Sequence, residues 1–360
     1  MLFNSFEFIL FFLPVTFLVF FFLNNLGRET ASRIWLLGAS LFFYGWWAPV
    51  YVPLILGSII FNYGINRTFS LRKFESKVCR QSCLTIGVLG NLSLLGYFKY
   101  ADFFLENWNW AFDSKFEFLH LILPLAISFF TFQQIAYLVD SYIGKVRESN
   151  FLNYSLFVLF FPQLISGPIV HHNEMMPQFN DPINKRVNFA NVVSGLLVFS
   201  IGLFKKVVVA DTFAIWASRG FDTTEIVTFI EAWIASLSFT LQLYFDFSGY
   251  TDMALGAALL FNVHLPKNFN SPYKALNIRD FWRRWHMTLS RFLKDYIYIP
   301  LGGNRSGSFR AYMNLIATFF LCGLWHGAGW TFIFWGLLHG IALAVHRFWL
   351  KVNIKMNYFF

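Results

Sequence analysis

The chain has 360 residues, of which 57% are hydrophobic, 21% aromatic and only 13% charged, with a formal net charge of +9. Soluble domains carry roughly a quarter of charged residues, and a fold of this size in water leaves much of its surface wet. The composition therefore excludes an ordinary soluble protein and indicates a chain whose solvent is largely a bilayer. It also disfavours nucleic-acid binding, because the basic residues form no arginine-rich soluble domain.

Apolar segments follow one another along the chain, and a helix needs about 20 such residues to cross a bilayer. Those that meet or approach this length are 7–24, 34–48, 51–66, 82–99, 118–139, 151–169, 189–213, 226–248, 309–325 and 328–350. The stretch 249–263 is short and contains glycine, which predicts a partial or re-entrant helix. The expected fold is all-α: a polytopic transmembrane helical bundle with about 10–11 membrane segments.

Loop charges predict the orientation of these segments. Basic residues such as Arg28 and Arg33 lie between the first two segments, whereas the loop 101–117 is mainly acidic. Because basic loops stay in the cytoplasm, the N-terminus is predicted to be extracytoplasmic. The prolines and glycine near the end of 151–169 predict a broken element, which a membrane protein tolerates only when it is buried in protein.

The longest polar stretch, 264–308, is predicted to lie at the cytosolic interface as amphipathic or re-entrant elements, because aromatic residues recur in it near helical spacing. Trp282 and His286 are four residues apart, which predicts a shared helix face. His286 has two open readings, polarising an acyl donor or serving as a structural interfacial histidine. Arg283 and Arg284 are expected to contact phosphate or lipid headgroups.

The strongest local signal is the sequence GLWHGAGW at residues 323–330. It places His326 in or at the end of an apolar helix, between two tryptophans and beside small residues. An ionisable group inside a membrane is a functional candidate by default, and a neutral imidazole can accept a proton near pH 7. The alternative is a histidine that satisfies a hydrogen bond between helices.

Two acidic residues, Asp246 and Asp252, leave a rival reading open, because buried carboxylates can relay protons in a transporter. We expect them instead to pair with Lys205, Lys206 or an arginine. No metal-ligand cluster and none of the sequence signatures of soluble enzymes is present.

Four stretches together resemble the membrane-bound O-acyltransferase family, in its bacterial alginate O-acetylation branch. They are DFWRRWH at 280–286, YIYIPLGGNR at 296–305, GLWHGAGW at 323–330 and PQLISGPI at 162–169. The resemblance covers roughly residues 1–350 and implies a single membrane domain over 1–360 around a central tunnel. Relatives in this branch commonly continue past the Trp-His-Gly helix pair, so we expect a compact member, a truncated one, or one whose missing segment is supplied by another chain.

The resemblance implies an O-acetyltransferase of the bacterial cytoplasmic (inner) membrane. An acetyl group is expected to pass from a cytosolic thioester, acetyl-CoA, to a partner or a surface polysaccharide such as alginate or peptidoglycan. The partner is expected to be a periplasmic or surface SGNH-type acetyltransferase, and no tightly bound cofactor or metal is expected. His326 and His286 are the expected catalytic residues. The expected substrate-binding residues are Trp325, Trp282, Arg283, Arg284, Asn304 and Gln133.

Two other classes remain open from the sequence. A transporter or flippase for a lipid-linked glycan would need paired repeats and essential intramembrane carboxylates, and no repeat is visible. A non-catalytic membrane scaffold would tolerate replacement of His326.

Overall fold

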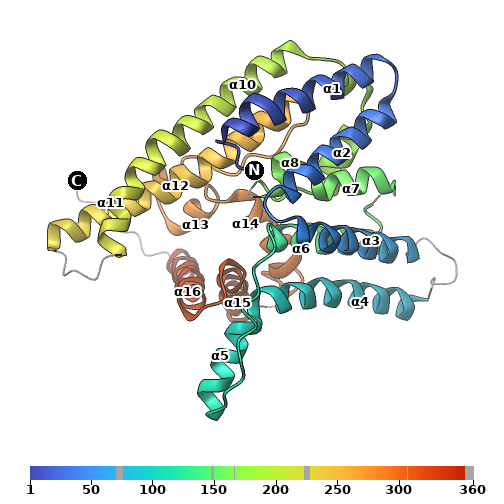
Figure 1. The fold of residues 1–360 in the computed structure, drawn as a ribbon. Helices are drawn as coiled ribbons and strands as arrows, with labels where there is room; N and C mark the ends of the chain where they lie inside the picture. The colour runs from blue at the N-terminus through green and yellow to red at the C-terminus, as the bar shows by residue number, and fades with distance from the viewer. Residues whose placement is uncertain (70–75, 147–149, 166, 223–227, 306, 353–360) are drawn as a thin grey trace. The chain divides into compact units, whose positions relative to one another are not determined.

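The computed structural model describes residues 1–69, 76–146, 150–165, 167–222, 228–305 and 307–352 (Figure 1). Within these ranges the regular structure is helical and no strand occurs, which confirms the predicted all-α class. The α-helices are α1 (Leu13–Asn25), α2 (Glu29–Gly45), α3 (Val52–Thr68), α4 (Lys77–Leu95), α5 (Ala101–Phe112), α6 (Ile127–Tyr142), α7 (Phe151–Leu159), α8 (Phe161–Leu164), α9 (His172–Asn180), α10 (Phe189–Phe204), α11 (Asp211–Phe221), α12 (Phe229–Leu260), α13 (Ile278–Trp282), α14 (Met287–Leu293), α15 (Ser308–His326) and α16 (Trp330–Val352).

Short helical turns of other types join several of these helices. The wider π-helical turns are η1 (Glu7–Phe12), η4 (Gly96–Tyr100), η6 (Lys205–Ala210) and η8 (Lys294–Tyr298), and the tighter 3₁₀ turns are η2 (Pro49–Tyr51), η5 (Pro182–Lys185) and η7 (Pro272–Lys274). The chain forms two compact units. The first contains Met1–Val88 and Pro124–Lys267, and the second contains Leu89–Leu123 and Asn268–Phe360.

Five helices in the described part of the chain are long and apolar enough to cross a membrane, which supports a polytopic membrane protein. They are Glu7–Asn25, Pro49–Thr68, Lys77–Phe112, Phe189–Phe221 and Trp330–Val352. The third and fourth run through η4 and η6, so a π-helical turn lies inside each of these two helices.

In the first unit, α10 and α12 lie side by side and approach each other at glycines (Figure 1). A Cβ added at Gly202 would lie 2.6 Å from the carbonyl oxygen of Gly249, and one at Gly256 would lie 2.5 Å from that of Gly195. The two glycines on each helix are seven residues apart, so they share a face. Close backbone approach through small residues is how membrane helices associate when lipid offers no hydrophobic driving force.

This packing also explains why the predicted break at 249–263 is wrong. The helix α12 continues without interruption through Gly249 and Gly256 to Leu260. Glycine weakens an isolated helix, but here both glycines are needed for contact with α10, and tertiary packing overrides the local preference.

The predicted pairing of Asp246 and Asp252 with lysines is confirmed. Lys205 Nζ lies 2.6 Å from Asp252 Oδ2, and Lys206 Nζ lies 2.5 Å from Asp246 Oδ1. Both lysines belong to η6, and both carboxylates belong to α12. Each carboxylate therefore has a cation partner within its own unit.

The predicted broken element is present at the junction of α7 and α8. Residues 160–164 are all buried, and the backbone amide of Phe161 donates to the Ser40 hydroxyl at 3.2 Å. A side chain of α2 thus satisfies a backbone group at this break, as burial in an apolar setting requires.

The glycine contacts predict that Gly202→Leu destabilises the first unit, because a large side chain would have to displace the backbone of α12. Overpacking costs about 1–3 kcal/mol or more, which thermal unfolding of the purified protein would detect as a lowered midpoint. The matched control is Gly64→Leu, at a position on α3 with no atom within 4 Å of the added Cβ. Equal midpoints for the two variants would contradict the packing argument.

Candidate active site

His326 is the last residue of α15. In the second unit it belongs to a small cluster of ring side chains formed with Trp325, Trp335 and His339, which we call the His326 cluster. Its side chain is exposed, and the ring centroids of Trp325 and Trp335 each lie 5.0 Å from the imidazole. The chain then turns into α16 through Gly327, where an added Cβ would come within 2.2 Å of the Phe332 ring and would displace it. The imidazole lies between two indoles while remaining accessible.

The C-terminal end of α15 is held by two residues that sequence reasoning missed. The Tyr100 hydroxyl donates to the Leu324 carbonyl oxygen at 2.6 Å, and Lys99 Nζ donates to the carbonyl oxygens of Trp325 and His326. A helix leaves its last carbonyls without intrahelical partners, and a cation at that end is favourable. Lys99 and Tyr100 thus fix the turn that carries His326. The sequence signal for Lys99 was an ionisable side chain at the very end of the predicted apolar segment 82–99.

His286 lies in the left-handed region at φ 40° and is only 1% exposed. Its Nδ1 is 3.0 Å from Asn268 Oδ1, which also accepts from the Thr288 amide at 3.3 Å and the Thr288 hydroxyl at 2.9 Å. Because that oxygen is an acceptor in every contact, the assigned tautomer has Nδ1 donating and Nε2 as the acceptor. The ring lies 6.3 Å from that of Trp325, so His286 packs behind the indole that supports His326.

The predicted shared helix face of Trp282 and His286 is wrong. The helix α13 ends at Trp282, and the left-handed backbone of His286 redirects the chain before α14 begins. Trp282 instead donates from Nε1 to His339 Nδ1 at 3.3 Å and packs edge-on against Phe319 and Trp335. Trp282 therefore joins the cluster through His339 and Trp335, whereas His286 joins it through Trp325. Trp335 contacts both His326 and His339.

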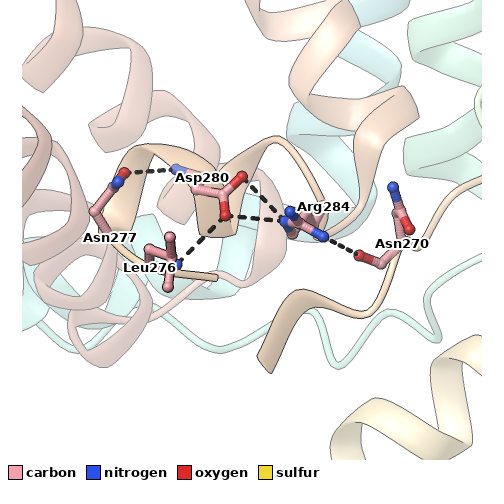
Figure 2. A network of polar contacts seen from close by, with 5 residues as sticks. All are labelled: Asn270, Leu276, Asn277, Asp280 and Arg284. Atoms are coloured by element: carbon pink, nitrogen blue, oxygen red, sulfur yellow. Dashed lines mark hydrogen bonds and ion pairs between the residues drawn. The ribbon is translucent and has the colours of Figure 1, made fainter. Parts of the chain in front are cut away.

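The two arginines of this stretch differ in their contacts, and Figure 2 shows those of Arg284. Arg284 Nε lies 3.0 Å from both oxygens of Asp280, whose backbone amide is in turn bound by the Asn277 side chain. Arg284 also donates to the Asn270 carbonyl at 3.4 Å, so it ties α13 to the preceding loop. Its charge is already compensated. Arg283 is exposed.

The two remaining predicted residues lie outside this cluster. Asn304 Oδ1 accepts from Tyr298 and Arg347, each at 2.5 Å, next to the beginning of α15, whereas His326 is at its end. Gln133 is buried on α6 in the first unit. Binding of substrate by either residue stays a prediction.

Burial lowers the pKa of His286 to about 3, with the neighbouring His326 as the second cause. An unfolded histidine takes up its proton near pH 6.5, so between pH 6.5 and about 3 the unfolded state binds more protons. We expect the stability contributed by neutral His286 to be lost as the pH falls through this window, with a slope of at most about 1.4 kcal/mol per pH unit.

The variant His286→Asn, which tolerates the left-handed backbone, should flatten the acid side of the stability curve measured by unfolding at several pH values. The exposed histidine His264 provides the control as His264→Asn. An unchanged acid slope in the His286 variant would count against this source of pH dependence.

Comparisons with known proteins show which protein family the sequence of this chain matches. A model of the membrane-bound O-acyltransferase family matches residues 80–359. The chain is 54% identical to a peptidoglycan O-acetyltransferase of Helicobacter pylori, over 99% of this chain and 72% of that protein. It is 41% identical to a probable alginate O-acetylase of Pseudomonas aeruginosa, over 96% of this chain and 66% of that protein. A teichoic acid D-alanyltransferase of Bacillus subtilis is 28% identical over 66% of this chain and 62% of its own length.

Proposed function

Because the chain belongs to the membrane-bound O-acyltransferase family, we propose that it transfers an acetyl group from acetyl-CoA towards a cell-surface polysaccharide. Membership makes it a membrane acyltransferase. The names of the relatives suggest peptidoglycan or alginate as the final acceptor, and the greater similarity to the peptidoglycan O-acetyltransferase favours peptidoglycan. The chain spans about two thirds to three quarters of the length of these relatives.

One observation carries the proposal: an accessible imidazole, His326, at the capped end of an apolar helix. In the proposed reaction, His326 removes the proton from an acceptor hydroxyl as its oxygen attacks the thioester carbonyl. The tetrahedral intermediate then expels the thiolate, which receives the proton from the imidazolium. The C–O bond forms, the C–S bond breaks, and the products are an O-acetyl ester and a free thiol. A positioned base contributes roughly 10²–10⁴-fold to such a rate.

The other groups of the cluster fit supporting roles. His286 is too deeply buried for direct contact with the donor, so we assign it a positioning role through Trp325. Trp282 and Trp325 contribute apolar walls to the cluster, and Arg283 remains available for an anion. We further propose the bacterial inner membrane as the location, an extracytoplasmic N-terminus and an SGNH-type acetyltransferase as the partner.

The transporter alternative loses support from the contacts of its carboxylates. Asp246 and Asp252 are each paired with a lysine of η6, which suits a structural role better than proton relay. The exposed His326 has no comparable explanation as a support of the fold.

We expect His326→Ala to abolish transfer of label from acetyl-CoA to the surface polysaccharide in intact membranes, because the general base is lost. Wild type and variant must reach the membrane in equal amounts, and His264→Ala, at an exposed position, serves as the control. Undiminished labelling in the His326 variant would contradict a catalytic role for His326 and favour a scaffold or transporter. Separate assays of peptidoglycan and alginate identify the acceptor.

Lys99→Met should lower kcat by up to about 100-fold with little change in KM for the donor, because a displacement of about 1 Å of a catalytic group has that cost. Lys99→Arg, which can still donate to the helix end, should recover part of the rate. The control Asn107→Ala removes a 2.8 Å bond from Trp330 to α5 without touching the end of α15. If Lys99→Met and Asn107→Ala behave alike, Lys99 has no specific positioning role.

A further inference from the structure

A second concave site lies in the second unit, at the beginning of α15 and the end of α16. It is a cavity of about 620 Å³, and the described residues that line it include four basic side chains and no acidic one. The basic residues are Arg279, His346, Arg347 and Lys351, and two tyrosines, Tyr298 and Tyr312, stand beside them. We call this the cationic cavity.

Two cations of this cavity, Arg347 and Lys351, are held by neutral groups. The Arg347 guanidinium donates to Asn304 Oδ1 at 2.5 Å and to the Tyr298 hydroxyl at 3.2 Å, and it lies 5.8 Å from the Tyr312 ring centroid. Lys351 Nζ donates to the Ser308 hydroxyl at 2.8 Å. Within the described ranges, no ion pair involves Arg279, Arg347 or Lys351, in contrast to Arg284 with its Asp280 partner.

Uncompensated cations in a concavity concentrate a field that favours anions. A guanidinium whose orientation is already fixed by a tyrosine and an asparagine is suited to phosphate oxygens, since its fork of donors matches their geometry. Several cations in one place fit a multiply charged anion, such as a phosphate monoester or a diphosphate, better than a carboxylate.

The cavity and the His326 cluster lie along the same faces of α15 and α16. On α16, residues spaced four or three apart run from the cluster to the cavity: Trp335, His339, Leu343, His346 and Leu350. On α15 the corresponding series is Ser308, Tyr312, Leu315, Phe319 and His326. Such spacing keeps residues on one side of a helix. From Tyr312 to His326 the helix rises about 21 Å.

We propose that the cationic cavity binds the phosphate ester groups of the thioester donor, so that the acyl end extends along α15 towards His326. This inference rests on the proposed function. It transfers the expected phosphate contacts from Arg284, which is neutralised, to Arg347 and Lys351. Trp282 packs on Phe319 and Trp335 between the two ends. A phospholipid headgroup presents the same chemistry, and the test separates the two sources.

The test measures equilibrium binding of CoA and of dephospho-CoA to the full chain in zwitterionic vesicles, in a His326→Ala background. Binding needs no turnover, so failure of the proposed chemistry leaves this test intact. We expect the double variant Arg347→Gln, Lys351→Gln to weaken CoA binding about tenfold or more. Dephospho-CoA lacks the ribose 3′-phosphate of CoA, so it should bind more weakly than CoA to the protein with an intact cavity. The double variant should discriminate less between CoA and dephospho-CoA.

Arg310→Gln is the matched control, because Arg310 is an exposed cation of α15 that does not line the cavity. Arg347→Lys keeps the positive charge but loses the paired donors of the guanidinium, so we expect its affinity for CoA to lie between those of the intact cavity and the double variant. This single variant also provides the test if the double variant fails to fold. A second arm titrates phosphatidylglycerol into the vesicles. If the lipid binds more weakly to the double variant while CoA binding is unchanged, the phosphate comes from lipid and the donor assignment is overturned. If the double variant binds CoA and phosphatidylglycerol as tightly as Arg310→Gln does, the cavity does not bind phosphate groups.

Discussion

The carbonyl groups at the end of α15 impose the constraint on which the candidate site depends. A helix that ends in an apolar environment must find donors for its last carbonyls, and this one ends at the residue expected to perform the chemistry. Lys99 and Tyr100 supply these donors from η4. The same contacts that satisfy the backbone therefore fix the imidazole, and stability and positioning have a common source.

Glycine contacts set the distances between helices in both units. Gly323 of α15 and Gly336 of α16 approach so closely that an added Cβ at position 336 would lie 2.3 Å from the Phe319 carbonyl oxygen. This approach brings Trp335 against His326. Lipid does not drive apolar helices together as water does, so close backbone packing and a small number of polar contacts determine where the side chains of the site meet.

The sequence was sufficient for features that depend on composition or on local pattern. The helical class, the broken element after α7 and the pairing of Asp246 and Asp252 with lysines were all predicted correctly. The backbone of His286 was not, because its left-handed conformation is supported by Asn268, which no spacing rule connects to it. Lys99 was missed for a related reason: at the end of the apolar segment 82–99 it looks like the boundary of a span, and only the fold brings it to α15.

The π-helical turn η4 constrains how the length of this segment can vary. Such a turn contains one residue more than the equivalent α-helical turn, and each residue added to or removed from an α-helix rotates everything beyond it by about 100°. Single-residue insertions or deletions between Gly96 and α5 would turn Lys99 or Tyr100 away from α15. Insertions or deletions before Gly96 would keep Lys99 and Tyr100 facing α15 only if the number of residues added or removed is close to a whole number of helical turns. Evolution can therefore alter the side chains of α4 far more freely than it can alter the number of residues in η4.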